Sequence, residues 1–129
     1  MAKGDDIQKR LIEFAVHVMD LCDAIPKSTT GSHIAGQLIR SATSAAPNYA
    51  EARGAESRND FVHKLGITFK ELNESEVWLA ILRRRKMLPA APLEDVEEEC
   101  KALCRIIAAS RKTASGVRRP ISEDPGRSD

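Results

Sequence analysis

Aromatic residues are scarce in this sequence, with one Trp, one Tyr and three Phe among 129 residues, or 4% of the chain. A β-sandwich needs runs of aromatic and β-branched residues, so the composition favours aliphatic, alanine-rich helices. Long hydrophobic runs are also missing, because Asp20 and Asp23 closely follow Val16 and Val18. This excludes a signal peptide or a membrane helix near the start of the chain. We therefore expect a cytoplasmic protein without membrane contact.

Cysteine is infrequent too, and the three cysteines are an odd number. In a reducing compartment Cys22, Cys100 and Cys104 stay thiols, and we expect them to be small core residues. Cys100 and Cys104 have a spacing that suits two metal ligands on one helix face, but no C-x-x-C or paired-His motif completes a site. The seven glycines are scattered and form no phosphate-binding loop. The sequence thus predicts no metal, no cofactor and no nucleotide hydrolysis.

Neither sign of charge dominates, because 20 Lys and Arg are balanced by 19 Asp and Glu, leaving a net charge of +1. Hydrophobic residues make up 42% of the chain and charged residues 30%. This composition excludes wholesale disorder and collagen-like repetition. At this length one compact domain is expected.

Apolar residues spaced three and four apart indicate four amphipathic helices. The predicted ranges are 5–24 after a cap at Asp5, 31–53, 57–86 after a cap at Ser57, and 92–114 before a stop at Gly116. Pro47 removes a backbone donor inside the second helix, which we expect to bend or restart there. Short loops between helices of similar length predict an all-α, antiparallel up-down-up-down bundle over 1–116. Residues 117–129 are predicted to be a disordered tail.

Antiparallel pairing of the second and third predicted helices places residues whose numbers add to about 111 at similar heights. Arg40 then faces Glu71, and we expect a buried or half-buried ion pair. Gly66 faces Ala45, and a close approach of the two backbones there would explain a glycine that costs about 1 kcal/mol in a helix. An acidic catalytic cluster of Glu71 and Glu74 is the alternative, but neutralisation by Arg40 requires no substrate.

The second and third predicted helices carry an ordered set of polar, small and aromatic residues at 40–44, 48–52, 56–58, 60–61 and 63–67, continued by Lys70, Glu71, Glu74 and Trp78. In this order the chain resembles, over roughly residues 7–110, the four-helix bundle proteins related to those encoded in intervening sequences of bacterial large-subunit ribosomal RNA. The Asn-Tyr-x-Glu-Ala and Asp-Phe-x-His-Lys-Leu strings are more similar to the branch of accessory proteins of diversity-generating retroelements. The sequence departs from common family patterns at Pro47 and Ala52.

The resemblance implies a four-helix protomer assembled into a ring-like homo-oligomer, typically a pentamer. It also implies nucleic-acid binding and a reverse transcriptase as a candidate partner, which are properties of the retroelement members. No catalytic residues are implied, and His17, His33 and His63 lie on three different predicted helices without a partner pattern. Self-association is also favoured by apolar residues beside the main stripes, namely Ile12, Val62, Phe69, Trp78 and Ile106.

Cations gather at one end of the expected bundle, where the antiparallel topology joins three separate segments. From these segments we predict a nucleic-acid-binding rim made of Lys9, Arg10, Arg53, Arg58, Arg111 and Lys112. Lys3 and Arg105 belong to the same end of the bundle. The basic run 83–86 is the next candidate, although the acids of 94–99 should partly neutralise it. The alternative function is a structural or protein-interaction ring that binds no nucleic acid.

Overall fold

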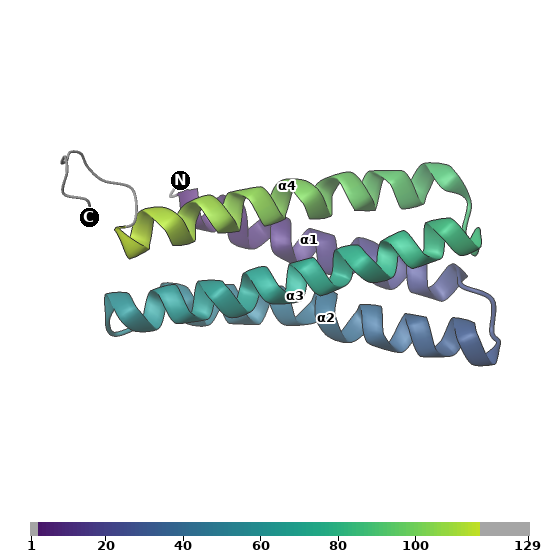
Figure 1. The fold of residues 1–129 in the computed structure, drawn as a ribbon, viewed down its shortest axis with the longest axis horizontal. Helices are drawn as coiled ribbons and strands as arrows, with labels where there is room; N and C mark the ends of the chain where they lie inside the picture. Colours follow the sequence, from purple (N-terminus) through teal and green to yellow (C-terminus); the bar gives the residue numbers. More distant parts are fainter. Residues whose placement is uncertain (1–2, 117–129) are drawn as a thin grey trace, which may run out of the picture.

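The computed structural model describes residues 3–116, which form a bundle of four α-helices. The helices are α1 (Lys3–Ala24), α2 (Thr29–Arg53), α3 (Arg58–Arg85) and α4 (Ala90–Ser115). Consecutive helices run antiparallel, with short connections at the two ends of the bundle (Figure 1). The predicted all-α, up-down-up-down bundle is confirmed, whereas the predicted tail at 117–129 lies outside the described residues. None of these four helices has an apolar stretch of the length that a bilayer crossing requires.

Serine caps fix where α2 and α3 begin. The Ser28 hydroxyl accepts a hydrogen bond from the Gly31 N–H at 3.0 Å, and the Ser57 hydroxyl accepts one from the Asp60 N–H at 3.1 Å. These bonds satisfy backbone donors that the first turn of a helix leaves unpaired. The sequence did not single out Ser28 as a cap. Because Ser28 caps the helix, α2 starts two residues earlier than expected. Glycine is required at position 31, since a Cβ there would lie 2.1 Å from the Pro26 carbonyl oxygen.

The expected cap at Asp5 was wrong, and of the bend or restart expected in α2 at Pro47 the restart is not found. α1 already includes residue 3, so Asp5 lies within its first turn and is not its cap. A carboxylate in this position still interacts favourably with the positive end of the helix dipole. α2 does not restart at Pro47 but continues through it. Next to Pro47, the side-chain amide of Asn48 donates to the carbonyl of Ser44, one turn earlier in the helix, at 2.9 Å. This side-chain hydrogen bond lies close to the backbone hydrogen bond that Pro47 cannot make.

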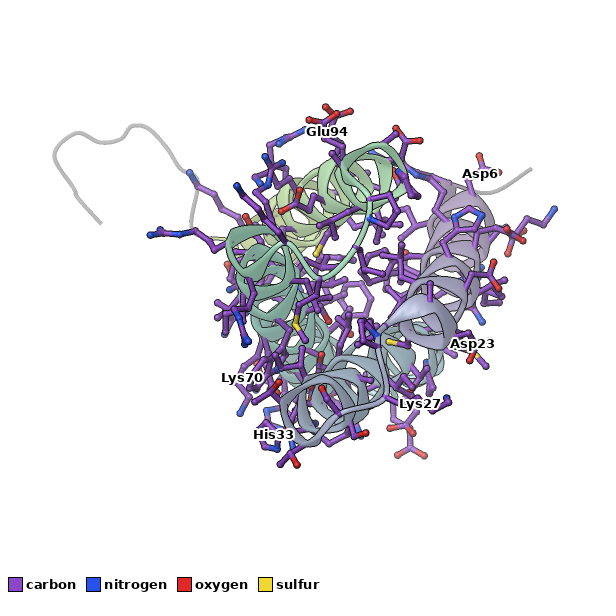
Figure 2. The ribbon with its side chains drawn as sticks, turned by 90° about the vertical axis from the view of Figure 1, so that its right-hand side faces the viewer. Asp6, Asp23, Lys27, His33, Lys70 and Glu94 are labelled. Carbon is purple, nitrogen blue, oxygen red and sulfur yellow. The ribbon has the colours of Figure 1, made fainter. Side chains whose placement is uncertain are left out.

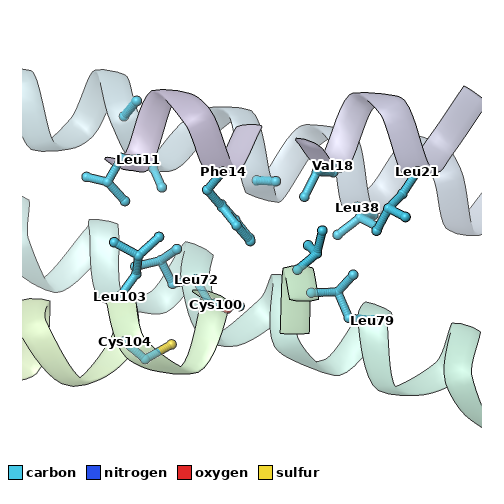
Figure 3. Close-up of a cluster of buried hydrophobic side chains, with 14 of the residues drawn as sticks. Leu11, Phe14, Val18, Leu21, Leu38, Leu72, Leu79, Cys100, Leu103 and Cys104 are labelled. Atoms are coloured by element: carbon cyan, nitrogen blue, oxygen red, sulfur yellow. The ribbon is translucent and has the colours of Figure 1, made fainter. Parts of the chain in front are cut away.

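Aliphatic side chains from all four helices fill the centre of the bundle (Figure 3). Phe14 is 1% exposed and is the largest of the fully buried side chains. Burial of a side chain of this size contributes about 1.5–3 kcal/mol. The three cysteines are buried free thiols, as predicted, and the Cys100 thiol donates to the Leu72 carbonyl at 3.3 Å.

Small polar residues lie in the α2–α3 contact, which is the most extensive in the bundle. The Oγ atoms of Ser41 and Ser75 are 2.8 Å apart, and both residues are fully buried. Each hydroxyl also lies within hydrogen-bond distance of a carbonyl of the preceding turn, Leu38 for Ser41 at 3.2 Å and Glu71 for Ser75 at 2.9 Å, and the two hydroxyl hydrogens serve two of these three contacts at a time. Because these buried hydroxyls are paired, the two helices approach closely without an unsatisfied polar group.

Each helix contacts two neighbours, so α1 is diagonal to α3 and α2 is diagonal to α4. A view along the bundle shows the helices at four corners with side chains between them (Figure 2). The α1–α4 contact is the least extensive of the four. Two grooves therefore run along this seam, one toward each end of the bundle.

Candidate nucleic-acid interface

The turn between α2 and α3, the start of α1 and the end of α4 lie at one end of the bundle (Figure 1). Arg53, Arg58, Arg111 and Lys112 come from these segments. Lys9 and Arg10 lie further along α1, where Lys9 is exposed beside the groove at the other end of the seam. The predicted rim is thus gathered in part at one end and extends in part along α1.

Arg53 is engaged in the contact between α1 and α2. Its guanidinium donates to Asp5 Oδ1 at 2.7 Å and to Gln8 Oε1 at 3.3 Å. It also lies against Gly4, where a Cβ would be 2.8 Å from Arg53 Nε. These contacts hold the start of α1 on the end of α2, so the charge of Arg53 is partly neutralised although the residue is exposed.

Arg10 is paired as well, through a bidentate contact across the α1–α4 seam. Its Nε and Nη2 donate to the two carboxylate oxygens of Glu99 at 2.9 and 2.7 Å. The hydrogen bond to Glu99 raises the pKa of Arg10. Glu99 is one of the acids of 94–99 that were expected to oppose the 83–86 run, and its pairing with Arg10 was not predicted. A fork-shaped guanidinium in this geometry fixes the register of the two helices.

The side chain of Arg111 lies against Gly66. The expected close approach of the α2 backbone therefore does not explain this glycine. A Cβ on Gly66 would lie 3.1 Å from Cζ of Arg111, whereas no atom of Ala45 is among its nearest neighbours. The approach that the sequence assigned to α2 is therefore made by a side chain of α4. Arg111 is exposed, so its guanidinium lies on the surface of the α3–α4 pair.

Several cations at this end make no ion pair with another residue of 3–116. They are Lys3, Arg58, Arg105, Arg111 and Lys112, all exposed. Asp6, Glu56 and Asp60 are the acids at the same end that are similarly unpaired. Lys64 is neutralised by Glu51 at 2.7 Å. Positive charge accessible to solvent thus exceeds negative charge at this end of a nearly neutral chain.

Arg40 and Glu71 lie 3.3 Å apart, at the heights expected from the antiparallel pairing. Arg40 also contacts Glu74, which accepts a further hydrogen bond from Trp78 Nε1 at 3.2 Å. The Arg40 side chain is 48% exposed and that of Glu71 16%, so the pair is half-buried and not in a dry site. The hydrogen bonds from Arg40 and Trp78 lower the pKa of Glu74. His33 packs edge-to-face on Trp78, with ring centroids 5.9 Å apart.

The basic run 83–86 lies at the opposite end of the bundle and is partly neutralised, as predicted. Arg83 donates to Glu97 Oε1 through Nη2 at 2.6 Å and through Nε at 3.0 Å. Glu97 is 5% exposed, so this carboxylate needs the arginine as its partner. Arg84, Arg85 and Lys86 remain exposed.

These features define a class of protein, the antiparallel four-helix bundle with a cationic end. Residues 4–109 match the model of the 23S rRNA-intervening sequence protein family, and the chain belongs to this family. A similar solved structure is a protein of unknown function from the S23 ribosomal protein family of Bacteroides thetaiotaomicron. It is 30% identical with a TM-score of 0.79, and the match covers 86% of this chain and 99% of that one. No curated protein matches the sequence. The family resemblance drawn from the sequence is confirmed.

Proposed function

We propose that this protein is a non-catalytic, homo-oligomeric accessory protein that binds nucleic acid through the basic end of its bundle. The observation that carries the proposal is the group of exposed cations at that end without an ion pair to any residue of 3–116, namely Lys3, Arg58, Arg105, Arg111 and Lys112. Phosphate backbones require only such cations, and binding through them has little sequence preference. The family name, which refers to ribosomal RNA intervening sequences, is consistent with a nucleic-acid connection.

Exposed apolar residues support self-association. Ile12, Val16 and Met19 form one stripe on α1 and are 43–49% exposed, while Val77 on α3 is 59% exposed. Of the residues expected to favour association, Phe69, Trp78 and Ile106 are instead partly buried against the core. An interface that covers the α1 stripe would remove it from water, and a ring would repeat the basic end around its axis. A pentamer is the assembly that the family resemblance implies.

A reverse transcriptase is the protein partner we propose, on the strength of the similarity to accessory proteins of diversity-generating retroelements. The strings that carry this similarity begin at Asn48 and at Asp60. Both strings lie next to the α2–α3 turn and therefore next to the basic end.

Charge reversal tests the basic end directly. Arg58→Glu with Lys112→Glu should weaken binding to RNA and DNA of any sequence and reduce the steepness of its salt dependence. Each lost phosphate contact removes about 0.7–0.9 from the slope of log affinity against log salt. Arg53 is left intact because it holds α1. The matched control is Arg84→Glu with Arg85→Glu, which makes the same charge change at the opposite end.

The expected result is a loss for the first double variant and a clearly smaller loss for the control. Equal losses would contradict the assignment and make 83–86 the site. The alternative function, a structural ring, predicts that the parent protein shows no salt-dependent binding even at low salt. Light scattering on the same samples checks assembly, and a mass of 14.2 kDa would contradict the homo-oligomer.

A further inference from the structure

A groove opens at the basic end, between the start of α1 and the end of α4. Its volume is about 810 Å³, within the range of about 300–1,000 Å³ typical of small-molecule sites. Small residues face each other across it, including Gly4 on α1 and Ala102 and Ala109 on α4. Ile7 and Ile106 supply apolar walls. The groove exists because α1 and α4 make the least extensive contact in the bundle.

The floor of this groove carries two of the few aromatic side chains, Tyr49 from α2 and Phe61 from α3. Tyr49 is only 5% exposed, and its hydroxyl makes no hydrogen bond with any residue of 3–116. Burial raises the pKa of Tyr49, although Arg53 partly offsets this.

Most hydroxyls of buried residues are hydrogen-bonded within the protein. Because the Tyr49 hydroxyl has no such partner among residues 3–116, a polar atom that enters the groove can bond to it without displacing a protein contact. The groove therefore combines an apolar slot with one unpaired hydrogen-bonding group at its floor.

The margins of the groove are mainly cationic. Lys3, Arg10 and Arg105 line it, against the single acid Asp6. Arg10 is held by Glu99, whereas Lys3 and Arg105 have no ion pair among the described residues. The lining thus offers phosphate-binding groups beside an apolar slot with an aromatic floor.

We propose that this groove binds one unstacked base of a single-stranded nucleic acid, with the flanking phosphates on Lys3 and Arg105. The proposal rests on the proposed function and adds to it a preference for single strands. A flat base fills an apolar slot and presents polar edge atoms to a hydroxyl, while its backbone carries the negative charge that the margins attract. In a duplex the base is stacked and paired, so it cannot enter.

The second groove of the α1–α4 seam lacks this combination. It is lined by Lys9, Arg10 and His17 but also by four acids, so its acids outnumber its basic residues: Glu13, Asp20, Asp95 and Glu99. Its apolar lining comes from Phe14, Leu21, Leu88, Pro89, Pro92 and Val96. It therefore offers no cationic preference for a phosphate backbone.

The experiment compares three probes on the full chain, a short oligothymidylate, an abasic strand of the same length, and a duplex of the same length. The parent should bind oligothymidylate about tenfold more tightly than the abasic strand, since a base held on an aromatic side chain contributes about 1–3 kcal/mol. Ala109→Leu fills the groove from an exposed position and should abolish this difference without changing duplex binding. Tyr49→Phe removes only the hydroxyl and should weaken oligothymidylate binding and leave the abasic strand unaffected.

The matched control is Ala80→Leu, the same change at an exposed position of α3 away from the groove. It should bind all three probes as the parent does, and circular dichroism confirms that each variant folds. Equal affinity of the parent for oligothymidylate and the abasic strand would overturn the base site, as would parental affinity of both groove variants. If the parent still binds the duplex in either of these cases, the basic end remains the nucleic-acid site and only the base groove is refuted. Absence of binding to every probe refutes the proposed function, and the groove with it.

Discussion

Gly66 provides the sharpest test of how α3 packs, because its environment differs from the one the sequence suggested. It lies inside α3, where glycine is less favourable than alanine by about 0.8–1.0 kcal/mol. A Cβ at this position would meet the guanidinium of Arg111 at 3.1 to 3.3 Å. No backbone atom is among the three nearest neighbours, so only the end of a flexible, exposed side chain has to move.

Gly66→Ala should therefore stabilise the protein by up to about 1 kcal/mol, which raises the melting temperature by about 3 to 5 °C. Two other glycines calibrate this expectation. A Cβ at Gly36 meets no atom within 4 Å, so Gly36→Ala should give the full gain. A Cβ at Gly31 would lie 2.1 Å from the Pro26 carbonyl oxygen, so Gly31→Ala should be clearly destabilising.

Thermal and urea unfolding, followed by far-ultraviolet circular dichroism, measure all three variants at one protein concentration. A fixed concentration is needed because self-association makes the melting temperature depend on it. If Gly66→Ala loses stability as Gly31→Ala does, a rigid backbone and not Arg111 limits the space, and the close approach to α2 would be the correct explanation. A variant that equals Gly36→Ala shows that Arg111 yields without cost.

Three further results are expected. A double-mutant cycle of Ser41→Ala and Ser75→Ala should show a coupling of about 1 kcal/mol or less in urea unfolding, because each hydroxyl keeps its second partner; strong coupling would contradict this. Glu74 has a pKa lowered below 4.5 by Arg40, so it adds stability above 4.5 that is lost as the pH falls through the lowered value. Glu74→Gln should thus be less stable than the parent at neutral pH and equally stable in strong acid. A stability difference between the two proteins that does not change with pH would refute the linkage. Burial raises the pKa of Cys22 to about 11, so iodoacetamide should label it far more slowly at pH 8 in the native protein than in urea.

Periodicity was sufficient to predict the fold because burial follows it closely. Leu65, Leu72 and Leu79, on the predicted stripe of the third helix, are all fully buried. Caps were predictable only where the sequence offered one candidate. Ser57 stands directly before an apolar stripe, whereas Ser28 precedes Thr29 in a segment with several residues able to cap.

The candidate site was less accessible to sequence reasoning because side chains pair across helices in ways that register alone does not determine. Arg53 and Arg10 carry the same charge as Arg58, but they are neutralised by Asp5 and Glu99. The groove could not be foreseen either, since it depends on the separation of α1 and α4. The only signal in the sequence was the small residues of α4, and these occur equally in close helix contacts.

The Arg10–Glu99 pair leads to a last prediction, because Arg10 lines the proposed base groove while its partner Glu99 lines the second groove. Arg10 is 43% exposed and Glu99 32%, so the loss of this half-exposed contact should cost no more than about 1 kcal/mol. Glu99→Gln frees the Arg10 guanidinium for a phosphate and removes a repulsive charge, so single-stranded oligonucleotides should bind more tightly at low salt, with a steeper salt dependence. Glu94→Gln is the matched control, since it changes the charge equally near the start of α4, which lies at the end of the bundle opposite the α2–α3 turn (Figure 1). Filter binding across a salt series measures both variants; an equal gain in the two would show that only net charge matters and that Arg10 does not act locally.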